Sequence, residues 1–167
     1  MIKYPKGISK TSVLSPIKRD RILPYSKVLD VSGMQPAAGD IIALMNPQQD
    51  TSEAFMQITR LEVHVDSAVM ANDTDLVVFG QETGTVIMNL QDGSAAETTW
   101  NSVENEDDTA DGGAQLKHRV FEEAVQIGLR FTTAHAAAIA ANKQVSIVCE
   151  YVKRAQTDAT ETKSVAA

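Results

Sequence analysis

The chain has 167 residues, of which 43% are hydrophobic and 22% are charged, and its formal net charge is −7. These values fit one soluble globular domain with a substantial core, and two domains would be cramped. No apolar run approaches the roughly 20 residues that span a bilayer, so no membrane segment is expected. The single cysteine, Cys149, excludes an internal disulfide and a cysteine-based zinc site, and the first ten residues lack the apolar stretch of a secretory signal.

Charge is strongly separated along the sequence. Residues 1–30 contain seven basic and two acidic side chains, whereas residues 31–116 contain fifteen acidic side chains and one basic one, Arg60. Such a separation favours binding of the basic part to an acidic surface, either on the same chain or on another copy. The distribution therefore indicates assembly more than chemistry.

Residues 1–36 have the composition of an extended basic arm. Four prolines recur in this segment, and each removes a backbone donor and favours extended geometry in the preceding residue. The many large apolar side chains are unusual for a solvated tail, so we expect the arm to lie on a neighbouring subunit. The alternative is a leader with two short edge strands packed on its own domain. The candidate contact residues of the arm are Tyr4, Ile8, Leu14, Ile17, Lys18, Arg19, Arg21, Leu23 and Tyr25.

Residues 37–90 have the pattern of a succession of short strands. The first is an apolar run that stops at Asn46 and Pro47, which predicts a buried strand. The second alternates between apolar and polar side chains, with Ile58 out of phase, and predicts a half-buried strand. Turn-forming residues bound two more. The strands predicted in this region are residues 41–45, 55–67, 76–79 and 85–90.

Residues 91–115 are acidic and small, and they predict a long exposed loop. Trp100 is its expected anchor, because it is one of the few sizeable apolar side chains before Leu116. Alternation returns at residues 119–131, where we favour a strand, because a helix would leave Gly128 in its last turn.

The last part of the chain combines an alanine-rich segment with a strong strand signal. Residues 134–141 have high helix propensity and lie between possible capping residues, which predicts one or two helical turns. Residues 144–152 alternate and predict a strand. Residues 155–167 are small and polar, and they predict a flexible tail.

Together these elements predict an all-β fold, an antiparallel β-sandwich with an extended N-terminal arm. The sandwich domain would cover residues 37–154 and include the acidic loop. At most one short helix is expected, near residues 133–142.

No pattern of polar residues identifies a catalytic, cofactor or metal site. Glu62, His64 and Asp66 lie on one side of a predicted strand and could hold a divalent metal, but such a row is typical of a solvated strand face. In the acidic loop, placing Asp107 first in a calcium-binding pattern puts His118, not a glutamate, at the last position, so this pattern fails. An irregular calcium site in the loop stays an alternative to a solvated, charged loop, which is the default. A nucleophile motif and a glycine-rich phosphate loop are both missing, so an enzyme is not expected.

The basic arm could in principle contact nucleic acid by neutralising phosphates. Its basic residues are interleaved with aliphatic ones, however, and the rest of the chain is acidic, which disfavours direct contact with nucleic acid. A better partner is the acidic surface of a neighbouring copy, where apolar side chains fill grooves and lysines meet carboxylates.

The pattern of residues 39–90 resembles that of β-rich bacteriophage structural proteins. A polar interval, an alternating strand, a small polar turn and another strand follow one another in GDIIALMNPQQDTSEAFMQITRLEVHVDSAVMANDTDLVVFGQETGTVIMNL. With its arm and acidic loop, the chain is similar to single jelly-roll proteins of phage capsids or to decoration proteins of phage heads. The resemblance implies a jelly-roll-like sandwich, symmetric assembly with copies of itself and other virion proteins, location in the virion after assembly in the host cytoplasm, and no cofactor.

Two other functions are alternatives. A ligand-binding or carbohydrate-binding β-sandwich would stack sugars on Trp100 and Tyr151, although aromatic residues make up only 5% of the chain. A metal-dependent enzyme of the cupin type would use His64 with His118 or His135.

Overall fold

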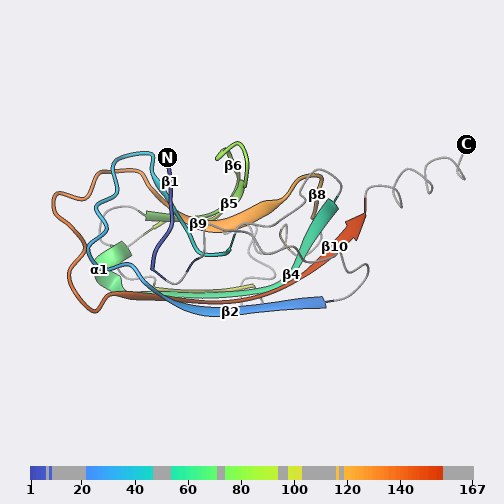
Figure 1. The fold of residues 1–167 in the computed structure, drawn as a ribbon, viewed down its shortest axis with the longest axis horizontal. Helices are drawn as coiled ribbons and strands as arrows, with labels where there is room; N and C mark the ends of the chain where they lie inside the picture. Colours follow the sequence, from blue (N-terminus) through green and yellow to red (C-terminus); the bar gives the residue numbers. More distant parts are fainter. Residues whose placement is uncertain are drawn as a thin grey trace, which may run out of the picture.

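The computed structural model contains two β-sheets that face each other (Figure 1). It describes residues 1–6, 8, 22–46, 54–70, 74–93, 98–102, 116 and 119–155. In this part of the chain, sheet I consists, in spatial order, of β1 (Ile2–Lys3), β3 (Ile41–Ala43), β9 (Val125–Phe131), β5 (Thr74–Gly80) and β6 (Val86–Gln91). Sheet II consists of β2 (Ile22–Asp30), β10 (Gln144–Ala155), β4 (Ala54–Val65) and β7 (Thr99–Asn101), and β8 (Val120–Phe121) also pairs with β4.

The chain passes repeatedly from one sheet to the other. β2 in sheet II is followed by β3 in sheet I, β4 in sheet II, the β5 and β6 pair in sheet I, β7 and β8 in sheet II, β9 in sheet I and β10 in sheet II. Among the described strands, every pairing is antiparallel except that of β1 with β3. The predicted all-β antiparallel sandwich is therefore confirmed.

The phase change at Ile58 has a structural cause. The pairing of β10 with β4 shifts register between Glu150 and Tyr151, so that Tyr151 lies opposite Ile58 and Glu150 lies opposite Arg60. The extra residue on β4 is Thr59, whose hydroxyl donates to the carbonyl oxygen of Glu150 at 3.0 Å. This bulge keeps Ile58 in the core together with the alternating residues that follow it.

The main core lies between the sheets, and a second apolar cluster lies on the outer face of sheet I. The second cluster consists of Ile41, Ala43, Val77 and Phe79, which alternate along β3 and β5 with residues of the main core. Residues 76–79 of β5 are therefore buried on both faces, which explains why they form an apolar run without alternation.

The structure places residues 22–36 in the sandwich, although the sequence pattern assigned them to the arm. β2 pairs with β10 over nine residues, and Leu29 and Val31 are fully buried. Pro24 is compatible with this strand, because the strand lies at the edge of sheet II and needs donors on one side only. The extended geometry expected here is therefore provided by a strand on the same chain, as the alternative of edge strands predicted.

A strand interrupts the predicted acidic loop. β7 pairs with β4, placing Trp100 opposite Val63, and the indole is 1% exposed. Trp100 is therefore a core residue on a strand that is too short to give an alternating pattern. Residues 94–97, 103–115 and 156–167 lie outside the described residues, and with them most of the loop and the tail.

The alanine-rich segment is a loop, and the short helix α1 (Ser67–Met70) lies elsewhere in the chain. Ile139 exchanges two backbone hydrogen bonds with the loop after β2, to Gly33 at 2.7 Å and to Met34 at 2.8 Å. This long-range pairing and the burial of Ile139 outweigh the high helix propensity of these eight residues, because so short a helix is only marginally stable by itself. No helix of the described residues is long and apolar enough to cross a membrane.

Candidate subunit interface

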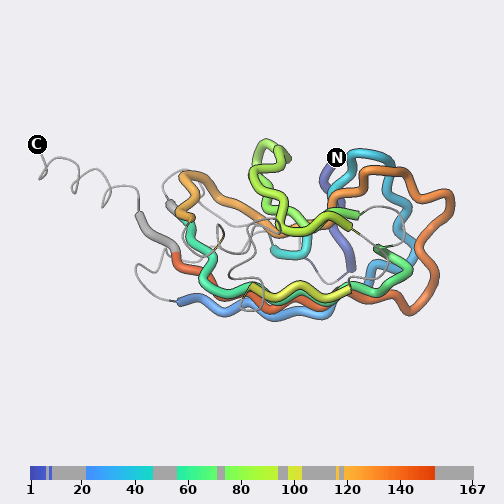
Figure 2. Tube along the Cα trace, turned by 180° about the vertical axis from the view of Figure 1, so that it is seen from behind, coloured from blue at the N-terminus to red at the C-terminus, as the bar shows by residue number. Residues whose placement is uncertain are grey.

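The N-terminal strap, defined as residues 1–6, joins the edges of the two sheets on one side of the sandwich (Figures 1 and 2). Ile2 pairs with Ile41 at the edge of sheet I. Lys6 forms an antiparallel bridge with Asp30 at the end of β2 in sheet II. The strap therefore closes the side of the sandwich on which β2 and β3 are the outer strands.

Apolar side chains hold the strap on the domain. Pro5 is buried, and Ile8, just beyond the strap, is 9% exposed in the main core. Ile2 and Tyr4 pack against the second cluster on sheet I, and burial raises the pKa of the Tyr4 hydroxyl. Two predicted arm contacts, Tyr4 and Ile8, are therefore engaged within their own chain.

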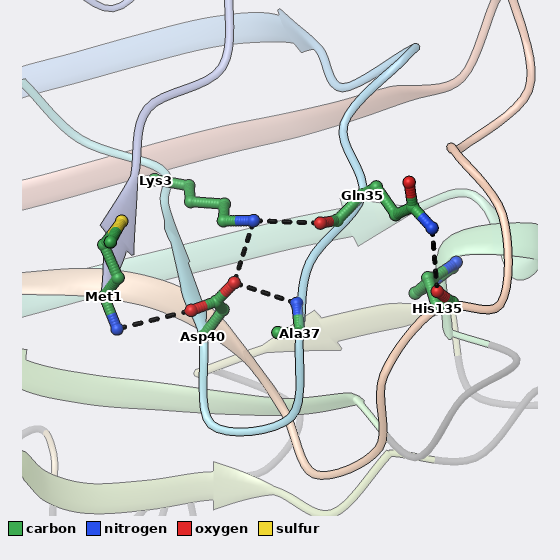
Figure 3. A network of polar contacts seen from close by, with 6 residues as sticks. All are labelled: Met1, Lys3, Gln35, Ala37, Asp40 and His135. Carbon is green, nitrogen blue, oxygen red and sulfur yellow. Dashed lines mark hydrogen bonds and ion pairs between the residues drawn. The ribbon is translucent and has the colours of Figure 1, made fainter.

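A polar network centred on Asp40 also holds the strap (Figure 3). One carboxylate oxygen, Oδ1, lies 3.3 Å from the amino group of Met1. The other, Oδ2, accepts hydrogen bonds from Lys3 Nζ and from the Ala37 amide, both at 2.8 Å. Lys3 Nζ also donates to the carbonyl oxygen of Gln35 at 2.9 Å. The carboxylate thus binds two cationic groups of the strap. Asp40 and β3 together form the surface that binds the strap, the strap receptor.

The Asp40 carboxylate depends on these cationic partners because its side chain is only 10% exposed. Burial by itself raises the pKa of this carboxyl, but the hydrogen bonds from Lys3, the Ala37 amide and the Met1 amino group outweigh burial and hold the pKa below its ordinary value of 3.8. The ionised form is therefore the form that the folded state stabilises.

Acid is expected to loosen the strap. Because the pKa of Asp40 is lowered by folding, its contribution to stability is complete above about pH 5 and is lost as the pH falls through the folded pKa. The Ile41 amide donates to the carbonyl oxygen of Met1 at 3.1 Å and therefore reports whether the strap is bound. Its hydrogen exchange, corrected for intrinsic rates, should show lower protection at pH 3 than at pH 7. In Asp40→Asn, protection should already be low at pH 7 and should change little with pH. Equal protection in both proteins at pH 7 would contradict this role.

The remaining predicted arm contacts divide into two groups. Leu23 and Tyr25 lie half-buried on β2, and burial raises the pKa of Tyr25 to about 12, with a weaker opposing interaction from the backbone of Asn46. The contact with the Asn46 backbone falls outside hydrogen-bond geometry, and no other described group meets that geometry at the Tyr25 hydroxyl. The other contacts lie outside the described residues and stay predictions: Leu14, Ile17, Lys18, Arg19 and Arg21.

β2 presents two exposed apolar side chains that the sequence analysis did not select. Ile22 is 55% exposed and Val28 is 62% exposed, and both lie on the outer face of the edge strand. Alternation with the half-buried Leu23 and Tyr25 is the signal that could have identified them. Exposed apolar residues on an edge strand are a candidate contact for another protein surface.

The polar row of Glu62 and His64 on β4 and Asp66 just after it has partners within the chain. His64 Nδ1 lies 2.7 Å from the hydroxyl of Thr99 on β7. Among the described residues, no group of three or more histidine, cysteine, aspartate or glutamate side chains could hold a metal ion. The ion pairs of the row are Glu62 with Arg60 at 3.6 Å and Asp66 with Lys143 at 3.2 Å.

The side chains that the alternative functions require are dispersed. Trp100 is in the core and Tyr151 is half-buried against it, so neither offers an open face for sugar stacking. His135 lies beside the loop after β2, where its carbonyl oxygen accepts from the Gln35 amide at 3.4 Å, and His118 lies outside the described residues.

Comparisons with known proteins show a similar fold in a phage capsid. No protein-family model matches this chain, and no curated protein sequence matches it. A chain in the solved structure of the capsid of Ralstonia phage GP4 has a similar fold, with a TM-score of 0.53 and 16% sequence identity. The match covers 91% of this chain and 97% of that chain, so the two chains are of similar length. The sandwich described here is therefore similar to a fold that occurs in a bacteriophage capsid.

Proposed function

We propose that this chain is a structural protein of a bacteriophage head, either a shell subunit or a decoration subunit, which assembles with copies of itself and with other virion proteins. The similarity to a chain of the Ralstonia phage GP4 capsid carries this proposal, because it extends over nearly the whole of both chains. The location that follows is the virion, after assembly in the host cytoplasm.

The strand order gives independent support. Without β1 and β8, sheet II has the order β2, β10, β4, β7 and sheet I the order β3, β9, β5, β6. This order of eight antiparallel strands in two four-stranded sheets supports assignment to the single jelly roll, a fold frequent in viral capsid and lectin domains. We assign the sandwich to this class.

The side chains favour assembly over the lectin-like alternative. A sugar site needs exposed aromatic faces, whereas Trp100 is 1% exposed. The exposed apolar residues Ile22 and Val28 instead lie on an edge strand next to the most basic part of the sequence. Charge complementarity with the acidic part of a neighbouring copy would orient such a contact. Neither catalysis nor direct contact with nucleic acid is part of the proposal.

Deletion of residues 1–21 is expected to leave a folded sandwich that no longer assembles. The deletion ends before β2, because removing β2 would break nine residue pairs with β10 and expose the core residue Leu29. Native mass measurement and electron microscopy of the full chain and of the truncated chain, at equal concentration, would show the change as loss of the oligomer.

Removal of residues 158–167 is the matched control. It shortens the chain at the other end, and its ten residues carry only two acidic and one basic side chain. This variant should assemble like the full chain. A protein without residues 1–21 that still forms the full oligomer would refute the role of the arm, and a full chain that stays monomeric at every concentration and on phage heads would refute the proposed function.

A further inference from the structure

The N-terminal strap lies between two grooves. It touches β3, the end of β2 and the adjoining loops. A groove of about 290 Å³ borders one side of it, and a groove of about 370 Å³ borders the other. The first groove is lined by Met1, Ile2, Gly39, Ile41 and residues 82–84, and the second by residues 1–4, Met34 and Gln35. Among the described strands, β1 pairs with β3 alone, so the strap can leave without disrupting a pair of other strands.

The receptor for the strap selects a cationic occupant. Asp40 is 7% exposed as a residue, and without the strap its carboxylate would keep only the hydrogen bond from the Ala37 amide. The low exposure includes the cover that the strap itself provides, so departure of the strap removes both cationic partners and lets water reach the carboxylate. Lys3 and the Met1 amino group satisfy it in the structure, and the same groups of an identical chain have the same chemistry. The best alternative occupant is therefore residues 1–6 of a second copy.

The connection is long enough for such an exchange. Thirteen residues, 9–21, separate Ile8 from the start of β2. Fully extended, thirteen residues span about 45 Å, whereas a domain of this size has a radius of gyration of about 15 Å. The strap of one copy can therefore reach the receptor of an adjacent copy while its own β2 stays in place.

From these observations we infer that assembled copies exchange their N-terminal straps, so that residues 1–6 of one copy pair with β3 and Asp40 of the next. This inference rests on the proposed function, because it needs copies held side by side. Exchange costs little, since the strap makes the same hydrogen bonds and ion pairs on a neighbour as on its own domain, and Ile8, which leaves its own core with the strap, finds an identical site there. It also gives the basic arm a defined docking site on its neighbour.

A disulfide between chains tests the exchange directly. Ile2 and Ile41 are partners in the parallel register, and neighbouring strands bring Cα atoms within the range of a disulfide. Ile2→Cys is mixed with a mass-tagged Ile41→Cys chain under assembly conditions and oxidised. The expected product is a covalent dimer that contains one chain of each kind. The wild-type chain is the control, because Cys149 is buried and its pKa is raised to about 12.

The double variant, with Ile2→Cys and Ile41→Cys in one chain, separates the two pairings. With exchange, oxidation gives covalent multimers, and without exchange it gives only monomers with an internal disulfide. Internally closed monomers together with no mixed dimer would overturn the inference. Absence of any disulfide in the double variant would overturn it as well, because the pairing of β1 with β3 would then not exist.

A second pair of variants leaves the buried Ile41 unchanged. Lys3→Glu and Asp40→Lys each place like charges at their own receptor. In each single variant alone, the strap should not bind its receptor. A mixture of the two variants should form heterodimers, because Glu at position 3 of one chain then pairs with Lys at position 40 of the other. Native mass measurement of the same samples distinguishes the outcomes. Oligomers that form without exchange would overturn this inference but not the proposed function. Monomers in every sample would overturn both.

Discussion

Replacing Gly128 by valine is expected to destabilise the protein by about 3 kcal/mol or more, which is at the upper end of the range for overpacking a core. Gly128 lies in the middle of β9, with β3 on one side and β5 on the other. A Cβ atom at this position would lie 2.6 Å from Ile41 Cγ2, 2.7 Å from Phe79 Cε1 and 3.0 Å from the carbonyl oxygen of Ile42. The oxygen belongs to the backbone of a paired strand, so rotation of side chains alone would not make room.

Thermal unfolding provides the measurement. Each kcal/mol corresponds to about 2–4 °C in a chain of this length, so the melting temperature of Gly128→Val should fall by roughly 10 °C. Gly128→Ala should give a smaller decrease. Val28→Ala removes an exposed side chain from β2 and should change stability by less than about 0.5 kcal/mol. A Gly128→Val protein that melts with the wild type would show that the outer cluster on sheet I is not closely packed.

Trp100→Ala is expected to cost about 3–5 kcal/mol, the usual range for truncating a buried aromatic side chain. The indole is one of the largest fully buried side chains, and it lies on β7, a strand of three residues at the edge of sheet II. Without the indole, β7 would retain little apolar packing against the core. Denaturant unfolding followed by circular dichroism measures the decrease in stability.

Trp100→Phe is the matched control. It keeps most of the apolar packing and removes the indole nitrogen, which has no hydrogen-bond partner among the described residues. Removal of an unsatisfied buried donor offsets part of the reduced packing, so the cost should be only about 1–2 kcal/mol. Equal costs for the two substitutions would indicate that the donor is satisfied or that the ring is not part of the core.

Local periodicity was enough to predict the long strands. β4 and β10 alternate over most of their length, and even the irregular phase of Ile58 marked the position of a real bulge. β2 was harder, because Pro24 and the exposed Val28 obscured an alternation that becomes clear only once β10 is known to lie beside it. β7 could not be predicted, because its three residues are too few to show an alternating pattern.

Two features could not be predicted from local sequence because they depend on residues far apart in the chain. They are the loop at residues 134–141 and the receptor for the strap. The alanine-rich loop is held by backbone hydrogen bonds to Gly33 and Met34, about a hundred residues earlier in the chain. In the sequence, Asp40 has the appearance of an ordinary turn residue after Gly39, and its role depends on the parallel pairing that brings Lys3 beside it. The charge of the N-terminal region was predictable, but its place of binding was not.

The proline in β2 limits how copies of this chain can associate. Pro24 has no amide hydrogen to donate to a strand that approaches the edge of sheet II. Pairing between two such edges would therefore lack a backbone hydrogen bond at each proline. Uninterrupted stacking of sheets into a fibre is therefore discouraged at that edge. In the assembly proposed above, contacts at this edge would therefore be made by side chains and terminal segments, which can close into a particle of finite size.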